Sequence, residues 1–253
     1  MSVDRGGLQR VAWLLVGMWA GILAGCSAHR GAVTESLPRQ DATLPELARV
    51  LAEHATVDAY RALVTVDVEH DRRKASVRGL ISFTPPRTFV VQGLDPLGRT
   101  LFTLSAVGED VRLERSGEGP ALVGAESIEA GLAPWMGSLR VADLLRLLGA
   151  SHGVVIDPLD LVALERGEDQ YTLYFLLMDG GRPRLDRKVF LERTRFLPTR
   201  EEWFDPHGSS RALIHLDRYE QVAGRWRPFM VTASGLADTL RIRVHELAPA
   251  GDP

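Results

Sequence analysis

Alternation of apolar and polar residues with a period of two constrains this chain more than any other feature. In the stretch 60–83, Val64 and Val66 alternate with polar neighbours, and Val77 and Ile81 do so again after a short turn. Successive side chains of a β-strand point to opposite faces, so a period of two indicates strands with one dry and one wet face. The chain must therefore bury the dry face of a sheet.

The same pattern recurs along most of the chain between short turns. Strands are expected near residues 60–69, 74–83, 89–94, 100–107 and 111–115, and again near 161–165, 171–177, 188–192, 199–204, 211–219, 225–233 and 239–245. A succession of strands with short connections predicts an antiparallel meander. The expected class is mainly β (α+β), with about 11–12 strands.

Two helices and one shorter segment interrupt the strands. Thr43 can cap a helix over 44–54, and a stripe from Val141 to Leu148 predicts a second helix that Gly149 can end. Residues 130–135 are expected to form a short helix or a loop. Because these helices are too few to cover a dozen flat strands, the sheet must curve. A closed barrel, a sandwich, or a half-open barrel with the helices as a lid or plug would each bury the dry face.

The N-terminus has the organisation of an export signal. Two arginines precede the apolar run 11–23, which is shorter than the roughly 20 residues of a membrane-spanning helix, and Leu23-Ala24-Gly25-Cys26 follows. That ending resembles a bacterial lipobox. The resemblance implies that 1–25 is a signal peptide and that Cys26 becomes a lipid-bearing N-terminus with diacylglyceryl and fatty acyl chains such as palmitate. The alternative is a small buried cysteine in an ordinary leader or in a cytosolic helix.

The lipobox divides the chain into three parts. Residues 26–43 show no apolar periodicity and are expected to form a lipidated N-terminus and flexible tether, followed by one domain over 44–253. Three acyl chains would hold the protein on a bilayer without a transmembrane helix. Ser27 stands where an aspartate would retain an enterobacterial lipoprotein at the inner membrane, so the outer membrane, facing the periplasm, is the expected location.

Composition and motifs exclude several functions. A formal charge of −3 and a pI near 6.2 argue against nucleic-acid binding. The single cysteine cannot form an intramolecular disulfide or a cysteine metal cage. The sequence lacks the common hydrolase, metalloprotease and nucleotide-binding motifs, His207 beside Asp205 is expected to be a solvated turn, and Glu201 and Glu202 should face opposite ways. We therefore expect no catalytic residues, no metal and no cofactor.

The most specific feature of the domain is the hairpin over 89–104, whose turn reads Asp95-Pro96-Leu97-Gly98. Together with the lipobox, the helix and the meander, and with 197–208 and 219–228, this hairpin resembles the LolA/LolB family of lipoprotein-localisation proteins. The resemblance implies a half-open barrel with a helical lid, acyl chains of lipoproteins or lipids as ligands, a LolA-like periplasmic carrier as partner, and insertion of the cargo into the outer membrane. It also implies that Leu97 contacts the membrane.

Inward-facing apolar side chains would line the acyl-chain cavity of such a fold. The expected set is Val64, Val66, Val77, Ile81, Phe83, Phe102, Leu104, Leu173 and Phe175. The alternative is a solid core that holds no ligand, in which case the protein would be an anchored scaffold or partner-binding module, expected to be a monomer in either case. A hydrolase would need a cluster of serine or carboxylate with histidine in a cleft.

Overall fold

The fold was analysed in a computed structural model, which describes residues 39–55, 59–85, 88–108, 110–136, 140–150, 161–235 and 239–250. The expected signal peptide (1–25), Cys26 and residues 27–38 lie outside the described residues. The part from Arg39 onward forms one compact unit.

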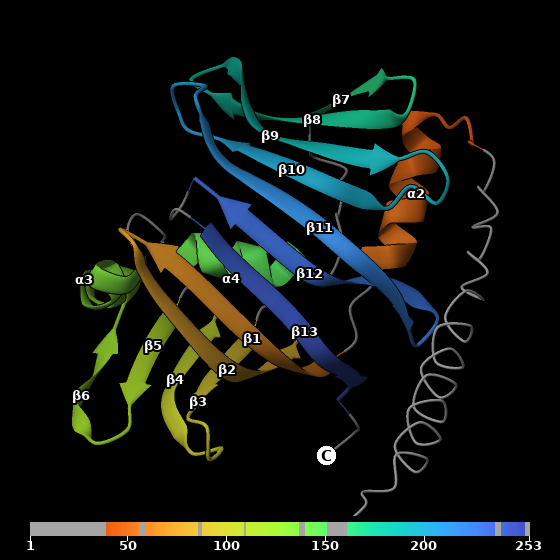
Figure 1. The fold of residues 1–253 in the computed structure, drawn as a ribbon. Helices are drawn as coiled ribbons and strands as arrows, with labels where there is room; N and C mark the ends of the chain where they lie inside the picture. The colour runs from red at the N-terminus through yellow and green to blue at the C-terminus, as the bar shows by residue number, and fades with distance from the viewer. Residues whose placement is uncertain are drawn as a thin grey trace, which may run out of the picture. The chain divides into compact units, whose positions relative to one another are not determined.

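A single sheet of 13 strands makes up most of this unit (Figure 1). The strands are β1 (Tyr60–His70), β2 (Arg73–Thr84), β3 (Thr88–Leu94), β4 (Thr100–Val107), β5 (Asp110–Arg115), β6 (Glu118–Val123), β7 (Leu161–Arg166), β8 (Gln170–Asp179), β9 (Arg182–Glu192), β10 (Pro198–Phe204), β11 (Ser210–Val222), β12 (Arg225–Ser234) and β13 (Thr239–Pro249). The spatial order is β6-β5-β4-β3-β2-β1-β13-β12-β11-β10-β9-β8-β7, and every pair of neighbours is antiparallel.

The centre of the sheet joins the two ends of the domain. β1 pairs with β2 on one side and with β13 on the other, so that Val64 lies opposite both Gly79 and Val244. The alternation in the sequence predicts which side chains of β1 face the core. Ala62 and Val64 are buried, whereas Arg61 is exposed. The alternation therefore identifies the inner face correctly.

Small residues and bulges accompany the curvature of the sheet. Gly79 on β2 pairs with Gly93 on β3, and the register shifts beside Gly93 and again between Leu63 and Val64. A β-carbon built on Gly93 would come within 2.2 Å of the Phe102 ring, so this ring covers the glycine directly. Glycines in a strand interior mark sites of close approach and tight bending. The sheet curves as expected, and it is open rather than closed.

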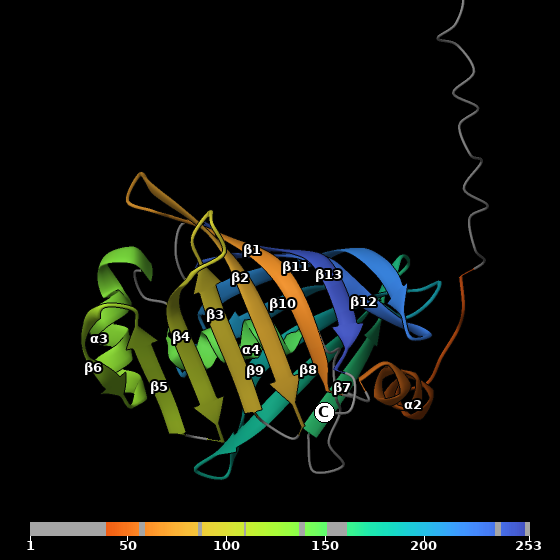
Figure 2. The same ribbon diagram turned by 90° about the horizontal axis from the view of Figure 1, so that it is seen from below.

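Three helices accompany the sheet in the described part of the chain: α2 (Leu44–Ala55), α3 (Ala125–Met136) and α4 (Val141–Ala150). Figure 2 shows α4 inside the curve of the sheet, with α2 and α3 at opposite sides. α2 begins after Thr43, whose backbone N–H and hydroxyl both donate to the Glu46 carboxylate at 2.7 Å. No helix among these residues is long and apolar enough to span a bilayer.

The expected mainly β, half-open architecture with few helices is confirmed, and two details differ. The structure contains β6, which sequence alternation did not predict because Gly119 and Pro120 interrupt the apolar pattern. It also extends the short segment expected at 130–135 into a helix of 12 residues, which buries Ile128 completely.

Candidate functional site

The hairpin between β3 and β4 presents Leu97 at its tip. The Gly98 amide donates to the Asp95 carbonyl at 2.9 Å, and Gly98 has a φ of 81°, as a type I turn followed by a left-handed glycine requires. The Asp95 carboxylate accepts from the amides of Leu97 and Arg99, at 2.8 and 2.9 Å, and pairs with the Arg99 guanidinium at 2.6 Å. The turn is therefore built by its own polar groups.

The side chain of Leu97 makes no contribution to this turn. It is 79% exposed, the largest exposed fraction among the exposed large apolar residues of the described chain. The Arg99 amide and guanidinium, together with the Leu97 amide, hold the pKa of Asp95 below its usual range. The carboxylate that supports the turn therefore stays ionised at neutral pH.

A second hairpin uses the same turn with a different residue at its tip. Between β10 and β11, the Gly208 amide donates to the Asp205 carbonyl at 3.0 Å, and the Asp205 carboxylate accepts from the amides of His207 and Ser209 at 2.8 and 2.9 Å. His207 is exposed, as expected of a solvated turn. The shared Asp-Pro-x-Gly motif is visible in the sequence, and the structure shows that this turn does not require leucine.

The inner face of the sheet is covered by helices in three separate places. α4 inserts Leu147 and Leu148 into a cluster on β1, β2 and β10–β13, α3 packs Ile128 against β4 and β5, and α2 packs Leu47 and Leu51 against β8 and β9. The cluster of α3 also contains Val141 of α4, so α3 and α4 share one apolar region, whereas the cluster of α2 includes no residue of another helix.

The residues expected to line a cavity are divided among these clusters. Val64, Ile81 and Phe83 lie under α4 with Val66 at the margin; Phe102 and Leu104 lie near α3; Leu173 and Phe175 lie near α2; and Val77 is half-buried on β2 opposite Val66. All nine lie in the sheet, but the structure does not bring them together around one space. Their role as a ligand-binding set stays a prediction.

Among the described residues, the space found between α4 and the sheet is small. A gap of about 20 Å³, lined by side chains that include Val64, Ile81 and Leu148, has room for about one water molecule. Pockets that hold drug-sized ligands measure about 300–1,000 Å³. A larger hollow of about 380 Å³ lies at the ends of β1, β2 and β13, but most of its lining is polar or charged. Leu147 and Leu148 of α4 fill the part of the inner face that β1, β2 and β10–β13 form.

Polar contacts hold α4 in this position. Asp143 is buried and pairs with Arg211 of β11, and Arg146 pairs with Asp186 of β9 at 3.1 Å. The Arg146 guanidinium also lies 4.4 Å from the centre of the Trp203 ring. These contacts join α4 to three strands, and none was predicted from the sequence.

A buried carboxylate completes the polar part of the inner face. Glu201 is 3% exposed and accepts a hydrogen bond of 3.0 Å from Nε1 of Trp203, with Arg187 at 3.9 Å. The expectation that Glu201 and Glu202 face opposite ways is met, because Glu202 lies on the outer side beside Lys188. Because adjacent residues of a strand point to opposite faces, the sequence indicates that one of the two glutamates faces inward. It does not indicate which groups would pair with that glutamate.

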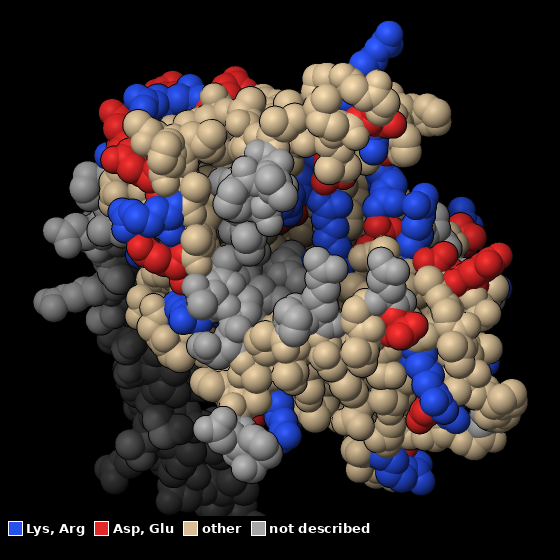
Figure 3. Space-filling model, turned by 180° about the vertical axis from the view of Figure 1, so that it is seen from behind, with Lys and Arg blue, Asp and Glu red and all other residues tan. Residues whose placement is uncertain are grey.

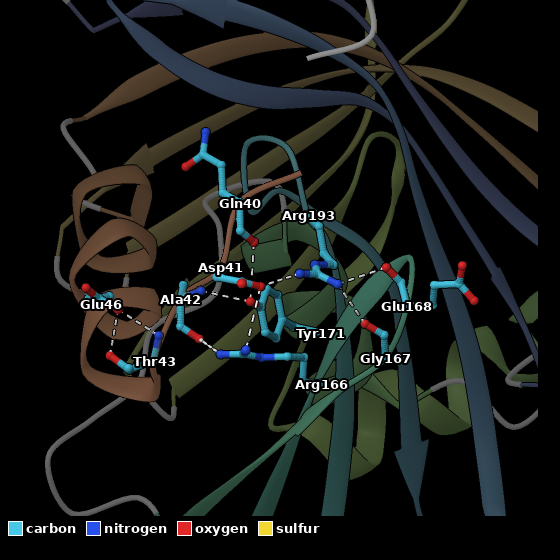
Figure 4. A network of polar contacts seen from close by, with 10 residues as sticks. All are labelled: Gln40, Asp41, Ala42, Thr43, Glu46, Arg166, Gly167, Glu168, Tyr171 and Arg193. Atoms are coloured by element: carbon cyan, nitrogen blue, oxygen red, sulfur yellow. Dashed lines mark hydrogen bonds and ion pairs between the residues drawn. The ribbon is translucent and has the colours of Figure 1, made fainter. Parts of the chain in front are cut away.

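The segment before α2 is bound to the far end of the same sheet (Figure 4). Tyr171 is fully buried, and its hydroxyl accepts from the Ala42 amide at 2.8 Å and donates to the Gln40 carbonyl at 3.3 Å. Asp41 pairs with Arg193 and, at 3.6 Å, with Arg166. The last residues of the expected tether are therefore part of the folded domain.

Charge and metal-ligand chemistry give no indication of another site. On the face that Figure 3 shows, basic side chains alternate with acidic ones and form no single patch among the described residues. Within the same part of the chain, no three His, Cys, Asp or Glu side chains are placed to hold a metal ion together.

Comparisons with known proteins bear on the fold. No protein-family model and no curated protein sequence matches the chain. Among solved structures, a LolA superfamily protein from Nitrosomonas europaea aligns with a TM-score of 0.59 and 12% identity, over 84% of this chain and 96% of that one. This chain has a LolA-type fold.

Two further structures share the LolA-type fold. A domain described as that of a putative outer membrane lipoprotein-sorting protein from Vibrio parahaemolyticus aligns with a TM-score of 0.61 and 12% identity, over 82% of this chain and 92% of that one. A DUF1329 family protein from Desulfovibrio piger aligns with a TM-score of 0.57 and 12% identity over the same shares. At this identity the likeness concerns the fold, and function has to be argued from the site.

Proposed function

We propose that this protein is a lipoprotein of the bacterial outer membrane that faces the periplasm and helps to insert acylated cargo into that membrane. The lipid on Cys26 would hold it there, a LolA-like carrier would deliver the cargo, and no covalent chemistry on the cargo is required. The observation that carries the proposal is Leu97, which is 79% exposed on a rigid turn that forms equally well with histidine at its tip.

A single exposed leucine is ordinary on a protein surface. Leu97 differs because three hydrogen bonds or ion pairs to Asp95 fix the backbone around it, so little order is lost when the side chain enters a bilayer. The LolA-type fold and the lipobox at Leu23-Ala24-Gly25-Cys26 give such a contact a lipid-handling context.

Cargo binding requires α4 to move in this proposal. The inner face carries apolar side chains suited to acyl chains, but Leu147 and Leu148 of α4 now fill it and leave a gap of about 20 Å³. An entering acyl chain would replace these leucines against the sheet, so that the ligand keeps the apolar surface of the strands covered when the helix moves away. The Arg211–Asp143 pair would have to break.

The test is a transfer assay with the lipidated protein in vesicles and an acylated lipoprotein as cargo. Leu97→Glu places a charge at the bilayer contact and should lower transfer at least about tenfold, since a charge in the membrane costs about 2.5–3.5 kcal/mol. His207→Glu places the same charge on the same type of turn at another site and should have no effect. Equal transfer by Leu97→Glu and the unmodified protein would refute the proposal.

The filled inner face favours one alternative, an anchored module that binds a protein partner and never a lipid. Mass spectrometry of the untagged domain, purified without its anchor, separates the two functions. Co-purified lipid or acylated peptide supports cargo binding. A ligand-free domain that also fails to take up added acylated peptide supports the anchored module.

A further inference from the structure

The contacts of residues 39–43 have a consequence for how this domain can meet a membrane. The Gln40 amide donates to the Arg193 carbonyl at 2.8 Å, and its side-chain amide donates to the Thr194 carbonyl at 3.0 Å. With the bonds of Ala42 and Asp41 to Tyr171 and Arg193, these contacts form a clamp, defined here as 39–43 with their partners on β8 and on the turns 167–169 and 193–194 (Figure 4).

The clamp is built of buried as well as exposed groups. Ala42 is 5% exposed and Tyr171 is fully buried, and the Arg193 side chain is 14% exposed. The guanidinium of Arg193 also donates to the carbonyls of Gly167 and Glu168, at 3.1 and 2.9 Å, and so ties the two turns to the clamped segment. Pulling out this segment would leave buried polar groups without partners, which is costly.

The clamp and Leu97 lie at opposite ends of the strands. An even number of antiparallel steps separates β3 from β8 and from β10 in the sheet, so all three strands run in the same direction. Leu97 follows the end of β3, whereas the clamp turns precede the starts of β8 and β10. Both ribbon views show α2, which the clamped segment enters, far from the β3–β4 turn (Figures 1 and 2).

Strand geometry gives the separation. Strands of seven residues, such as β3 and β10, are about 23 Å long, and six strand spacings of about 4.8 Å lie between them along the curved sheet. Leu97 and the clamp are therefore roughly 35 Å apart. The 13 residue steps from Cys26 to Arg39 limit the tether to a reach of at most about 45 Å.

We propose that the clamp fixes the point where the membrane tether joins the domain, at the end of the sheet opposite Leu97, so that tether length limits contact between Leu97 and the bilayer that holds Cys26. This inference rests on the lipid anchor and the Leu97 contact of the proposed function. In this proposal, Leu97 reaches the membrane that holds Cys26 only in those orientations of the domain that leave the clamp within reach of the tether.

The test uses the full lipidated protein in vesicles of phosphatidylethanolamine and phosphatidylglycerol. An environment-sensitive dye attached to Leu97→Cys reports insertion into the bilayer. The dye labels only this position, because lipidation blocks the only native thiol, Cys26. Deleting residues 29–34 leaves about seven residues before Arg39, about 24 Å at full extension. This deletion should weaken the dye signal, because Leu97 can then reach the membrane only where the clamp lies within about 24 Å of it.

Opening the clamp should then restore the signal in the shortened protein. Asp41→Ala combined with Tyr171→Phe removes the bonds of Asp41 to Arg193 and of Ala42 to Tyr171 and leaves the two Gln40 bonds to Arg193 and Thr194. Release of this weakened segment adds about five residues, which returns the maximum reach to about 40 Å. Arg49→Ala is the matched control, since it removes only an exposed ion pair with Glu53 inside α2. Circular dichroism confirms that each variant is folded, and amide exchange at Ala42 should be slow in the parent protein and fast in the opened one.

Two results would overturn the inference. One is an unchanged dye signal after the deletion; the other is a signal that stays weak in the opened protein although the Ala42 amide exchanges fast. A missing signal in the parent protein overturns the Leu97 contact of the proposed function instead. In that case slow, Tyr171-dependent exchange at Ala42 supports the clamp, and fast exchange in the parent overturns it.

Discussion

The contact between Gly93 and Phe102 yields the sharpest test of the inner face. An alanine at position 93 would place its β-carbon 2.2 Å from Cε1 of Phe102, whereas carbon atoms normally approach to about 3.5–4.0 Å. The ring would have to move by more than about 1 Å, and overpacking of this kind costs about 1–3 kcal/mol. Alanine regains about 0.5–1 kcal/mol relative to glycine in a strand. Gly93→Ala should therefore lower the free energy of unfolding by about 1–2 kcal/mol.

Urea unfolding followed by tryptophan fluorescence measures this change, and Phe102→Leu provides the second arm of a double-mutant cycle. The smaller side chain leaves room for the new methyl group, so Gly93→Ala should cost about 1 kcal/mol less in the Phe102→Leu background. The double variant would then be more stable than the sum of the two single substitutions predicts. An equal cost of Gly93→Ala in both backgrounds would show that the ring does not cover the glycine.

Three further predictions concern polar groups. Tyr219→Phe removes a 2.5 Å hydrogen bond to the carbonyl of the residue that begins β10, and should cost about 1–3 kcal/mol in urea unfolding. Asp95→Ala should lower the protection of the Leu97 amide against exchange, and because the pKa of Asp95 is lowered in the folded protein, acid should also lower this protection once the pH falls below the ordinary pKa near 3.8. Burial and the nearby charge of Arg227 lower the pKa of His54. The unfolded chain therefore binds a proton on His54 more tightly than the folded one, and thermal stability should fall as the pH drops below about 6.5. His54→Gln should remove that part of the acid sensitivity, and an unchanged pH profile would contradict the assignment.

The sheet could be predicted from the sequence because its signal is local. A strand with one buried face needs apolar residues at every second position, and Leu240, Ile242 and Val244 of β13 satisfy this alone. β6 was not predicted because an edge strand tolerates glycine and proline, which erase the pattern. The turn at Leu97 was equally local, since Asp95 and Gly98 determine its geometry within four residues.

The clamp and the contacts of α4 could not be predicted in this way. Asp41 and Arg193 are 152 residues apart in the chain, and Arg211 and Asp143 are 68 apart. No period or motif relates such pairs, because their meeting depends on the strand order of the whole sheet. The sequence likewise indicates that Glu201 and Glu202 face opposite ways, but only the fold shows that Glu201 is buried with Trp203.

The pairing of β1 with β13 at the centre of the sheet has a consequence for how the protein is made. Val64 meets Val244 about 180 residues further along the chain, so the middle of the sheet stays open until translation has passed the last strand. Contacts of such high sequence separation form late and slow the folding reaction. During synthesis β1 can pair only with β2, and the apolar face of this hairpin has no complete core to join. A chain that lacks β13 after a premature stop should be left with two exposed strand edges, on β1 and β12, and should aggregate.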